Sequence, residues 1–182
     1  YDKSDESARN NRSVYLAKLR QILHKVGEAQ LQQDKGKWIL RFPDIYVDYL
    51  DYRSIIGKTI IKVKDIEHLS AILTKGSFLP ECSYLWLDDT KALIADYAIT
   101  LLTDFSDRMD KEKNTELINS IADALFTVDP LNDTALSLKC RFYNLMGKPY
   151  LSKQLFTNYT KDYKNVYGEE YNRTYSDILA YS

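Results

Sequence analysis

The segment S-A-R-N-N-R-S-V-Y-L-A-K-L-R-Q-I-L, residues 7–23, decides the fold expected at the start of this 182-residue chain. Its leucines recur at spacings of three and four residues, at Leu16, Leu19 and Leu23. Such spacing places them on one face of an α-helix, while basic and aromatic residues project from the rest of the cylinder. Gly27 follows a histidine and a lysine at the end of this segment, and helices commonly stop at a glycine preceded by cations. The sequence therefore predicts a basic amphipathic helix that ends near Val26.

A β-hairpin is expected directly after this helix. The runs A-Q-L-Q (29–32) and K-W-I-L-R-F (37–42) alternate in part between polar and apolar residues, as strands do. Residues 33–36 separate them, and this polar segment contains the glycine that hairpin turns favour. Pro43 and Asp44 then break the second strand. A basic helix followed by a short hairpin is the closing half of a winged helix.

Three stretches of the sequence resemble a known family of regulators. The order R-N-N-R-S-V-Y-L-A-K-L-R-Q-I-L (9–23), hairpin, Y-V-D-Y-L-D-Y (46–52) resembles the recognition helix, wing and exit of the OmpR-type winged-helix domain. That domain occurs in regulators that continue into a bacterial transcriptional activator domain. The segments G-S-F-L-P-E-C-S-Y-L-W-L-D-D-T-K-A-L (76–93) and D-P-L-N-D-T-A (129–135) resemble parts of such an activator domain. The resemblance covers nearly the whole chain and implies a DNA-binding transcriptional regulator.

The resemblance also implies which residues face DNA. In the resembled domain the recognition helix lies in the major groove, where Arg and Lys reach guanine edges or phosphates. The matching positions on the helix and the wing are Asn11, Arg12, Tyr15, Lys18, Arg20, Lys35 and Lys37. Without the resemblance, the helix residues are also typical of an ordinary solvated helix face, and Lys35 and Lys37 of a solvated hairpin turn. The charge distribution suits phosphate contact modestly, because residues 1–42 hold nine Lys and Arg against five Asp and Glu, and residues 43–182 hold sixteen against twenty-one.

The start of the chain departs from the family pattern. A complete winged helix has a small sheet and two helices before the recognition helix, and the residues before Ser7 are too few to form them. Tyr1 stands first in place of an initiating Met, which also indicates a fragment of a longer regulator. We therefore expect the full-length parent to bind duplex DNA, and this fragment alone to bind it weakly or not at all.

The expected fold class is mainly α, with a tetratricopeptide-like helical domain preceded by a partial winged helix of one helix plus a β-hairpin. The domains are residues 1–42, the C-terminal part of the winged helix, and residues 43–182, the activator domain. Apolar spacing and stop signals predict helices near residues 48–56, 63–73, 86–105, 117–126, 135–146, 150–166 and 171–181. The pattern from Ala135 to Gly147, followed by Ser152 and Phe156, has the spacing of one tetratricopeptide helical pair.

Tyrosines crowd the C-terminal helices and give a candidate surface for a partner. Tyrosine is favoured at protein interfaces because it combines a large apolar ring with a polar tip. The candidates near the last turn are Tyr163, Tyr167 and Tyr171. Packing between helices, with the hydroxyls at the surface, is the alternative interpretation. For the helical domain as a whole, we expect self-association or a protein partner.

Composition excludes several classes of protein. With 45% apolar and 13% aromatic residues the chain has enough side-chain volume to fill a core. Its uncharged apolar runs fall far below the roughly 18 residues that a membrane-spanning helix needs, so no membrane contact is expected. Cys82 and Cys140 are far apart in sequence, which favours idle thiols in a reducing cytoplasm over a disulfide framework.

Motifs for catalysis, cofactors and metals are absent from the sequence. It has no nucleophile elbow, no H-E-x-x-H, no P-loop and no dinucleotide fingerprint, so we expect neither an enzyme nor a cofactor. Asp44, Asp48 and Asp51 could converge on a helix, but capping and charge balance account for them better than a metal. His24 and His68 are expected at the surface or its boundary.

Two other functions compete with gene regulation. The first is a tetratricopeptide-like scaffold that binds protein and never contacts DNA, and salt-dependent binding to duplex DNA distinguishes the regulator from it. The second is a hydrolase that uses the acidic clusters, which would require carboxylates that converge in a cleft.

Overall fold

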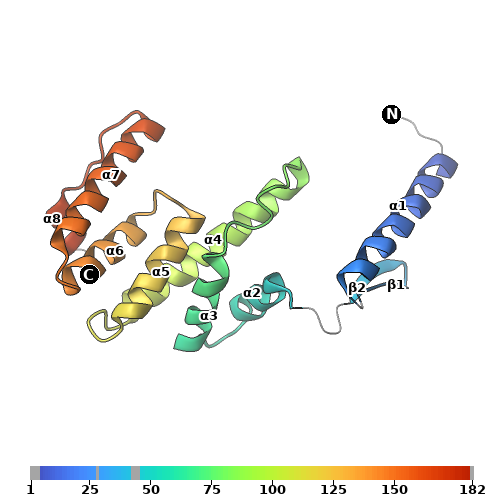
Figure 1. The fold of residues 1–182 in the computed structure, drawn as a ribbon, viewed down its shortest axis with the longest axis horizontal. Coiled ribbons are helices and arrows are strands. Elements are labelled where there is room, and N and C mark those ends of the chain that lie inside the picture. The colour runs from blue at the N-terminus through green and yellow to red at the C-terminus, as the bar shows by residue number, and fades with distance from the viewer. Residues whose placement is uncertain (1–4, 28, 42–45, 181–182) are drawn as a thin grey trace. The chain divides into compact units, whose positions relative to one another are not determined.

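The computed structural model is mainly α-helical, with eight helices and one two-stranded antiparallel sheet in the described part of the chain (Figure 1). The structure describes residues 5–27, 29–41 and 46–180, without the side chains of residues 5, 6 and 26. The expected fold class, mainly α with one helix and a hairpin at the N-terminus, is confirmed. The chain divides into two compact units, Tyr1–Asp48 and Tyr49–Ser182. The predicted boundary after residue 42 lies outside the described residues.

The N-terminal unit consists of α1 (Asp5–Val26), β1 (Gln30–Asp34) and β2 (Lys37–Arg41). Helix α1 ends at Val26, as its sequence predicts, and packs against β1. The predicted apolar face is covered at one end only, because Leu23 is buried while Leu16 is half-buried and Leu19 is 39% exposed.

The turn of the hairpin is tighter than expected. Strand β1 includes Gln33 and Asp34, and Asp34 pairs with Lys37, so the turn is Lys35–Gly36 alone. Our prediction that the turn spans residues 33–36 was therefore too long. Lys35 and Gly36 have φ angles of 47° and 80°. Two consecutive residues with positive φ form a two-residue turn whose twist matches that of the strands, so the ladder can run right up to it.

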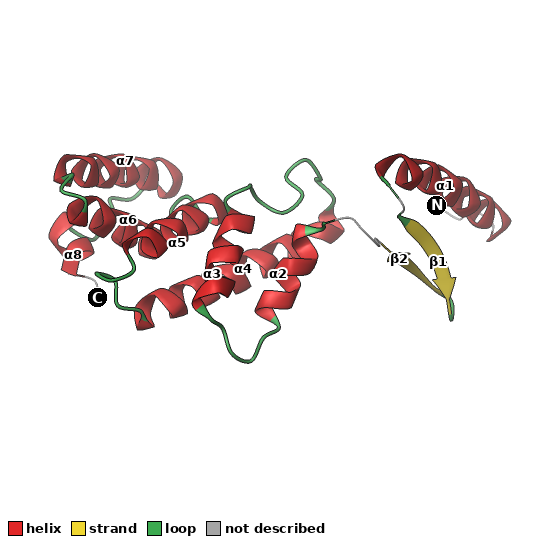
Figure 2. Cartoon of the chain, turned by 60° about the horizontal axis from the view of Figure 1, so that its bottom comes forward, coloured by secondary structure: helices red, strands yellow, loops and turns green. Residues whose placement is uncertain are grey.

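The second unit is a stack of helices (Figure 2). Its elements are α2 (Asp48–Ile56), α3 (Val63–Leu73), α4 (Leu85–Arg108), α5 (Thr115–Val128), α6 (Asp133–Leu145), α7 (Pro149–Tyr167) and α8 (Tyr175–Ala180). Helix α5 packs against α3, α4 and α6, and α6 also packs against α7 and α8. Each of the predicted helices is present. Helix α8 begins at Tyr175, later than expected, because Thr174 and Asp177 form a capping box. The backbone N–H of Thr174 donates to Asp177 Oδ2 at 2.7 Å, and that of Asp177 donates to Thr174 Oγ1 at 3.2 Å.

The core of the helical unit has two parts, and α6 contributes to both. The larger part joins α2, α3, α4 and α5, and its largest fully buried side chains are Ile66, Leu69, Leu102, Ile118, Ile121 and Leu125. The smaller part joins α6, α7 and α8 through Leu136, Cys140, Tyr159 and Ile178. No helix in the described ranges is long and apolar enough to span a bilayer.

Leu125→Ala tests the larger core. The side chain of Leu125 is fully buried, so its truncation removes apolar contacts and leaves a cavity. We expect the free energy of unfolding, measured by urea denaturation followed by far-UV circular dichroism, to fall by about 2–5 kcal/mol. The matched control is Leu85→Ala: Leu85 is 90% exposed, and its loss should change stability by less than about 0.5 kcal/mol. Equal effects of the two substitutions would contradict the packing described above.

Candidate functional site

The residues expected to face DNA are all exposed. Asn11, Tyr15 and Lys18 follow one another on α1 at spacings of four and three residues, which places them on one face of the helix. Tyr15 is 68% exposed. Lys25 continues this face two turns further along. The face therefore presents an amide, a phenol and two cations to solvent, together with Ile22, which is 58% exposed.

Arg20 and Arg12 lie on other faces of α1. Arg20 is two residues past Lys18, on another side of the cylinder, and its guanidinium stands 5.6 Å from the centre of the Trp38 ring on β2. This cation–π contact ties the hairpin to the helix. Arg12 precedes Leu16 by four residues and so shares the apolar face, beyond the part that the hairpin covers. Two residues that we expected to face DNA thus lie away from the face of Asn11 and Tyr15.

The hairpin turn supplies the remaining two predicted residues. Lys35 is in the turn and Lys37 is the first residue of β2, and both are exposed. Because the turn is only two residues long, the two ammonium groups belong to the tip of the hairpin. A hairpin tip with two lysines fits the wing position, where a backbone phosphate would be met.

The Lys and Arg side chains within residues 7–41 form no ion pairs with side chains that the structure describes. These residues hold eight Lys and Arg against two Asp and Glu. The ion pairs found between described side chains involve residues of the helical unit. There, for example, Lys139 Nζ lies 2.5 Å from Asp123 Oδ1. Unpaired cations on an exposed surface attract a polyanion without first breaking an internal contact.

The three tyrosines expected to bind a partner lie together at the end of α7. The Tyr163 ring centre is 4.6 Å from that of Tyr167 and 5.1 Å from that of Tyr171. Tyr163 and Tyr171 are half-buried, whereas Tyr167 is 58% exposed. Tyr167 also lines an open hollow of about 480 Å³ that reaches the Asp129–Leu131 turn. Tyr167 is therefore the member of the group that an incoming partner could contact most directly.

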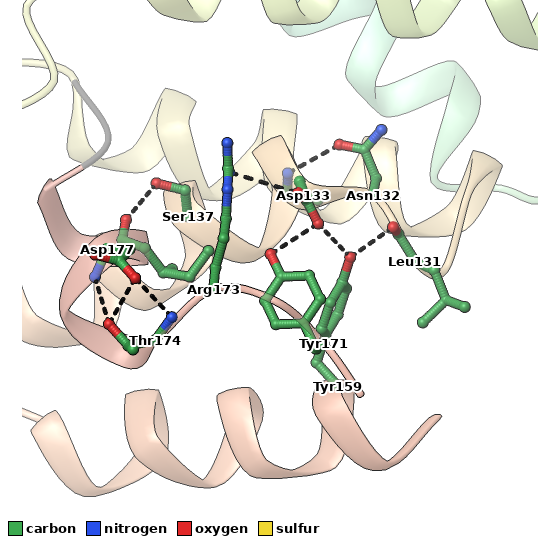
Figure 3. A network of polar contacts seen from close by, with 11 residues as sticks. Leu131, Asn132, Asp133, Ser137, Tyr159, Tyr171, Arg173, Thr174 and Asp177 are labelled. Atoms are coloured by element: carbon green, nitrogen blue, oxygen red, sulfur yellow. Dashed lines mark hydrogen bonds and ion pairs between the residues drawn. The ribbon is translucent and has the colours of Figure 1, made fainter. Parts of the chain in front are cut away.

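A carboxylate at the start of α6 organises this end of the molecule (Figure 3). Asp133 Oδ1 lies 2.7 Å from the Tyr159 hydroxyl and accepts a 2.9 Å hydrogen bond from the Tyr171 hydroxyl. Its other oxygen, Oδ2, is 3.5 Å from Arg173 Nη1. The Tyr159 hydroxyl also lies 2.6 Å from the Leu131 carbonyl. Asp133 thus links α6 to α7 and to the segment that precedes α8.

The local sequence does not predict this network. The structure assigns the cap of α6 to Asn132, whose Oδ1 accepts from Ala135 N at 3.0 Å. Asp133 is then free to bond Tyr159 and Tyr171, which lie 26 and 38 residues further along the chain. No local pattern reports contacts at such separations.

The contacts with Asp133 also affect the pKa values of two tyrosine hydroxyls. Burial and then the hydrogen bond to Asp133 raise the pKa of Tyr159 and the pKa of Tyr171 well above the usual range. In the larger core, burial raises the pKa of Tyr52 to about 12. The Tyr52 hydroxyl donates to the Ile94 carbonyl at 2.7 Å, which fixes α2 on α4.

The remaining candidates for chemistry are dispersed. Within the described ranges, no three His, Cys, Asp or Glu side chains lie close enough together to hold a metal ion. Asp51 pairs with His68, whose Nε2 is 3.1 Å from Asp51 Oδ2, while Asp44 lies outside the described residues. Cys140 is a buried free thiol, and burial raises its pKa.

Comparison of the chain with protein-family models, with curated proteins and with solved structures found no match. The functional proposal therefore depends on the residues and geometry described above.

The raised pKa values of Tyr52, Tyr159 and Tyr171 predict a loss of stability in alkali. In the unfolded chain they ionise near pH 10, whereas the folded protein keeps them protonated to higher pH. The unfolded state therefore releases protons first, and the free energy of unfolding should fall as pH rises above about 10. Tyr159→Phe removes one such group and should make this fall shallower, measured by urea denaturation at several pH values. The control Tyr150→Phe removes a tyrosine that is 67% exposed, and an equal effect from it would contradict the assignment.

Proposed function

We propose that this chain is part of a DNA-binding transcriptional regulator. In this proposal α1 and the β1–β2 hairpin contact duplex DNA, and the helical unit binds a protein partner or a second copy. The observation that carries the proposal is the set of exposed Lys and Arg side chains within residues 7–41 that form no ion pair with a described side chain. The resemblance to the OmpR-type winged helix supports the same roles for the helix and the hairpin.

The geometry of α1 fits the major groove. That groove is about 12 Å wide and admits one α-helix. Asn11, Tyr15 and Lys18 form the face that would turn toward base edges, because an amide and an ammonium group can both bond to them. Lys35 and Lys37 at the hairpin tip would neutralise backbone phosphates. Arg20, held over Trp38, would keep the hairpin in place against the helix.

A helical scaffold that binds protein and never contacts DNA is the second candidate. The exposed Tyr167 beside its open hollow favours it, and so does the excess of acidic residues after residue 42. The two functions differ in one measurable property. Only the regulator must lose affinity for duplex DNA steeply as salt rises.

Binding of the chain to a fluorescein-labelled DNA duplex, followed by anisotropy from about 50 to 200 mM salt, tests the proposal. We expect weak, sequence-independent binding, in the range of about 10⁻⁴ to 10⁻⁶ M that phosphate contacts supply. The double variant Lys35→Glu, Lys37→Glu, at the two exposed lysines assigned to phosphates, should bind more weakly. Its slope of log affinity against log salt should be shallower by about two, because two phosphate contacts are lost.

The matched control is Lys153→Glu, Lys161→Glu, which makes the same charge change at two exposed positions of α7. It should keep most of the wild-type affinity and the full salt slope. Absence of binding by the wild-type chain at the lowest salt would favour the scaffold. Equal losses in the two double variants would show that net charge, and not the surface of α1 and the hairpin, determines binding.

A further inference from the structure

Helix α4 (Leu85–Arg108; its place in the helical unit is shown in Figure 1) carries large apolar side chains that the rest of its unit leaves exposed. Trp86 is 73% exposed, Leu93 55% and Tyr97 59%. Their spacings of seven and four residues place them on one face of the helix. The residues that α4 buries lie on other sides of the cylinder: Leu87, Ala98, Leu102 and Ser106. Scattered apolar residues at a surface need no explanation, but three large ones on the same face of one helix do.

The apolar stripe formed by Trp86, Leu93 and Tyr97 extends past the beginning of the helix. The Tyr84 ring stacks on that of Trp86, with ring centres 6.0 Å apart and planes 18° from parallel. Tyr84 is itself 60% exposed, and Leu85 is 90% exposed. From Trp86 to Tyr97 the stripe is about 16 Å long, at the helical rise of 1.5 Å per residue. This is the length over which one helix contacts another through about three turns.

Two aspartates line one margin of the stripe. Asp89 is three residues after Trp86 and four before Leu93, and Asp96 is three after Leu93, so each lies next to the apolar side chains. Both are exposed, and neither forms an ion pair or a hydrogen bond with a residue in the described ranges. By contrast, Asp104 further along α4 is paired with Arg108.

Helix stability accounts for only part of this pattern. A carboxylate near a helix N-terminus is stabilised by the helix dipole, which explains Asp88 and Asp89. Asp96 lies more than two turns from that end, where the effect has faded. Nor does the dipole explain a tryptophan, a leucine and a tyrosine in line at the surface.

We propose that this face of α4 binds the apolar side of a basic amphipathic helix from a protein partner. The apolar residues of the partner would cover Trp86, Leu93 and Tyr97, and its Lys or Arg side chains beside them would meet Asp89 and Asp96. Charge complementarity selects this occupant. A second copy of α4 would bring aspartates of the same sign to the interface, and an anionic membrane surface would be repelled. The inference does not depend on DNA contact by the N-terminal unit.

A designed 18-residue peptide of leucine and lysine, with leucines at helical spacing and a fluorescein label, serves as the probe. Its anisotropy is measured against the full chain. We expect saturable binding that a peptide with glutamate in place of lysine does not show. A third peptide, with the composition of the first but its leucines out of helical register, should also fail to bind, because it presents no apolar face.

The variants separate the two parts of the surface. Leu93→Arg should weaken binding by about tenfold or more, as loss of an apolar anchor does. The double variant Asp89→Lys, Asp96→Lys should also weaken peptide binding, and the loss should grow as salt falls, because the new lysines repel those of the peptide. The control Ile60→Arg alters another apolar side chain, 74% exposed and in the loop between α2 and α3, and this variant should bind the peptide as the wild type does. All substituted positions are exposed, and far-UV circular dichroism checks that the helices are intact.

Three results would overturn the proposal. Equal binding by wild type and Leu93→Arg would place the peptide elsewhere. Equal binding of the out-of-register peptide would reduce the interaction to charge attraction. Sedimentation showing that the wild type self-associates, and that Leu93→Arg is monomeric, would identify a second copy as the occupant in place of a basic partner helix.

Discussion

Helix α6 is the element on which the helical unit depends, because it buries residues on two faces. Ala135 and Leu138 belong to the larger core, while Leu136 and Cys140 belong to the smaller one. A helix covered on two sides loses its solvent-facing polar stripe, which explains why four consecutive residues from Ala135 are buried. One of them, Ser137, satisfies its buried hydroxyl by donating to the Ile178 carbonyl at 2.8 Å. Side chains of this one helix thus take part in both cores.

Hydrogen bonds complete what apolar packing begins around α6. Beyond the bonds to Asp133, Asn144 donates to the Cys140 carbonyl at 2.8 Å and lies 3.1 Å from the Ser152 hydroxyl. The Tyr175 hydroxyl reaches the same serine at 2.8 Å. These contacts fix α7 and α8 on α6 through side chains that are themselves mostly shielded from water. The concentration of tyrosine at this end is thus largely structural, with Tyr150 and Tyr167 as exposed exceptions among the described residues.

The helices could be predicted from sequence because their signals are local. Leucine spacing and Gly27 were enough to end α1 at Val26, and similar signals located α2 to α7. The contacts that position side chains are not local. Nothing in the sequence joins Arg20 to Trp38 or Asp133 to Tyr171, because each contact depends on how two elements meet in space. The candidate DNA surface was accordingly predicted as a set of residues, whereas the contact that holds Arg20 against the hairpin appears only in the structure.

The two-sided burial of α6 also has a mechanical consequence. Protein interiors are packed too densely for one face of a helix to move while the other stays in place. A displacement of α7 or α8 would therefore also strain the packing of α6 against α5. A partner bound beside Tyr167 would in this way act on the larger core through a single helix.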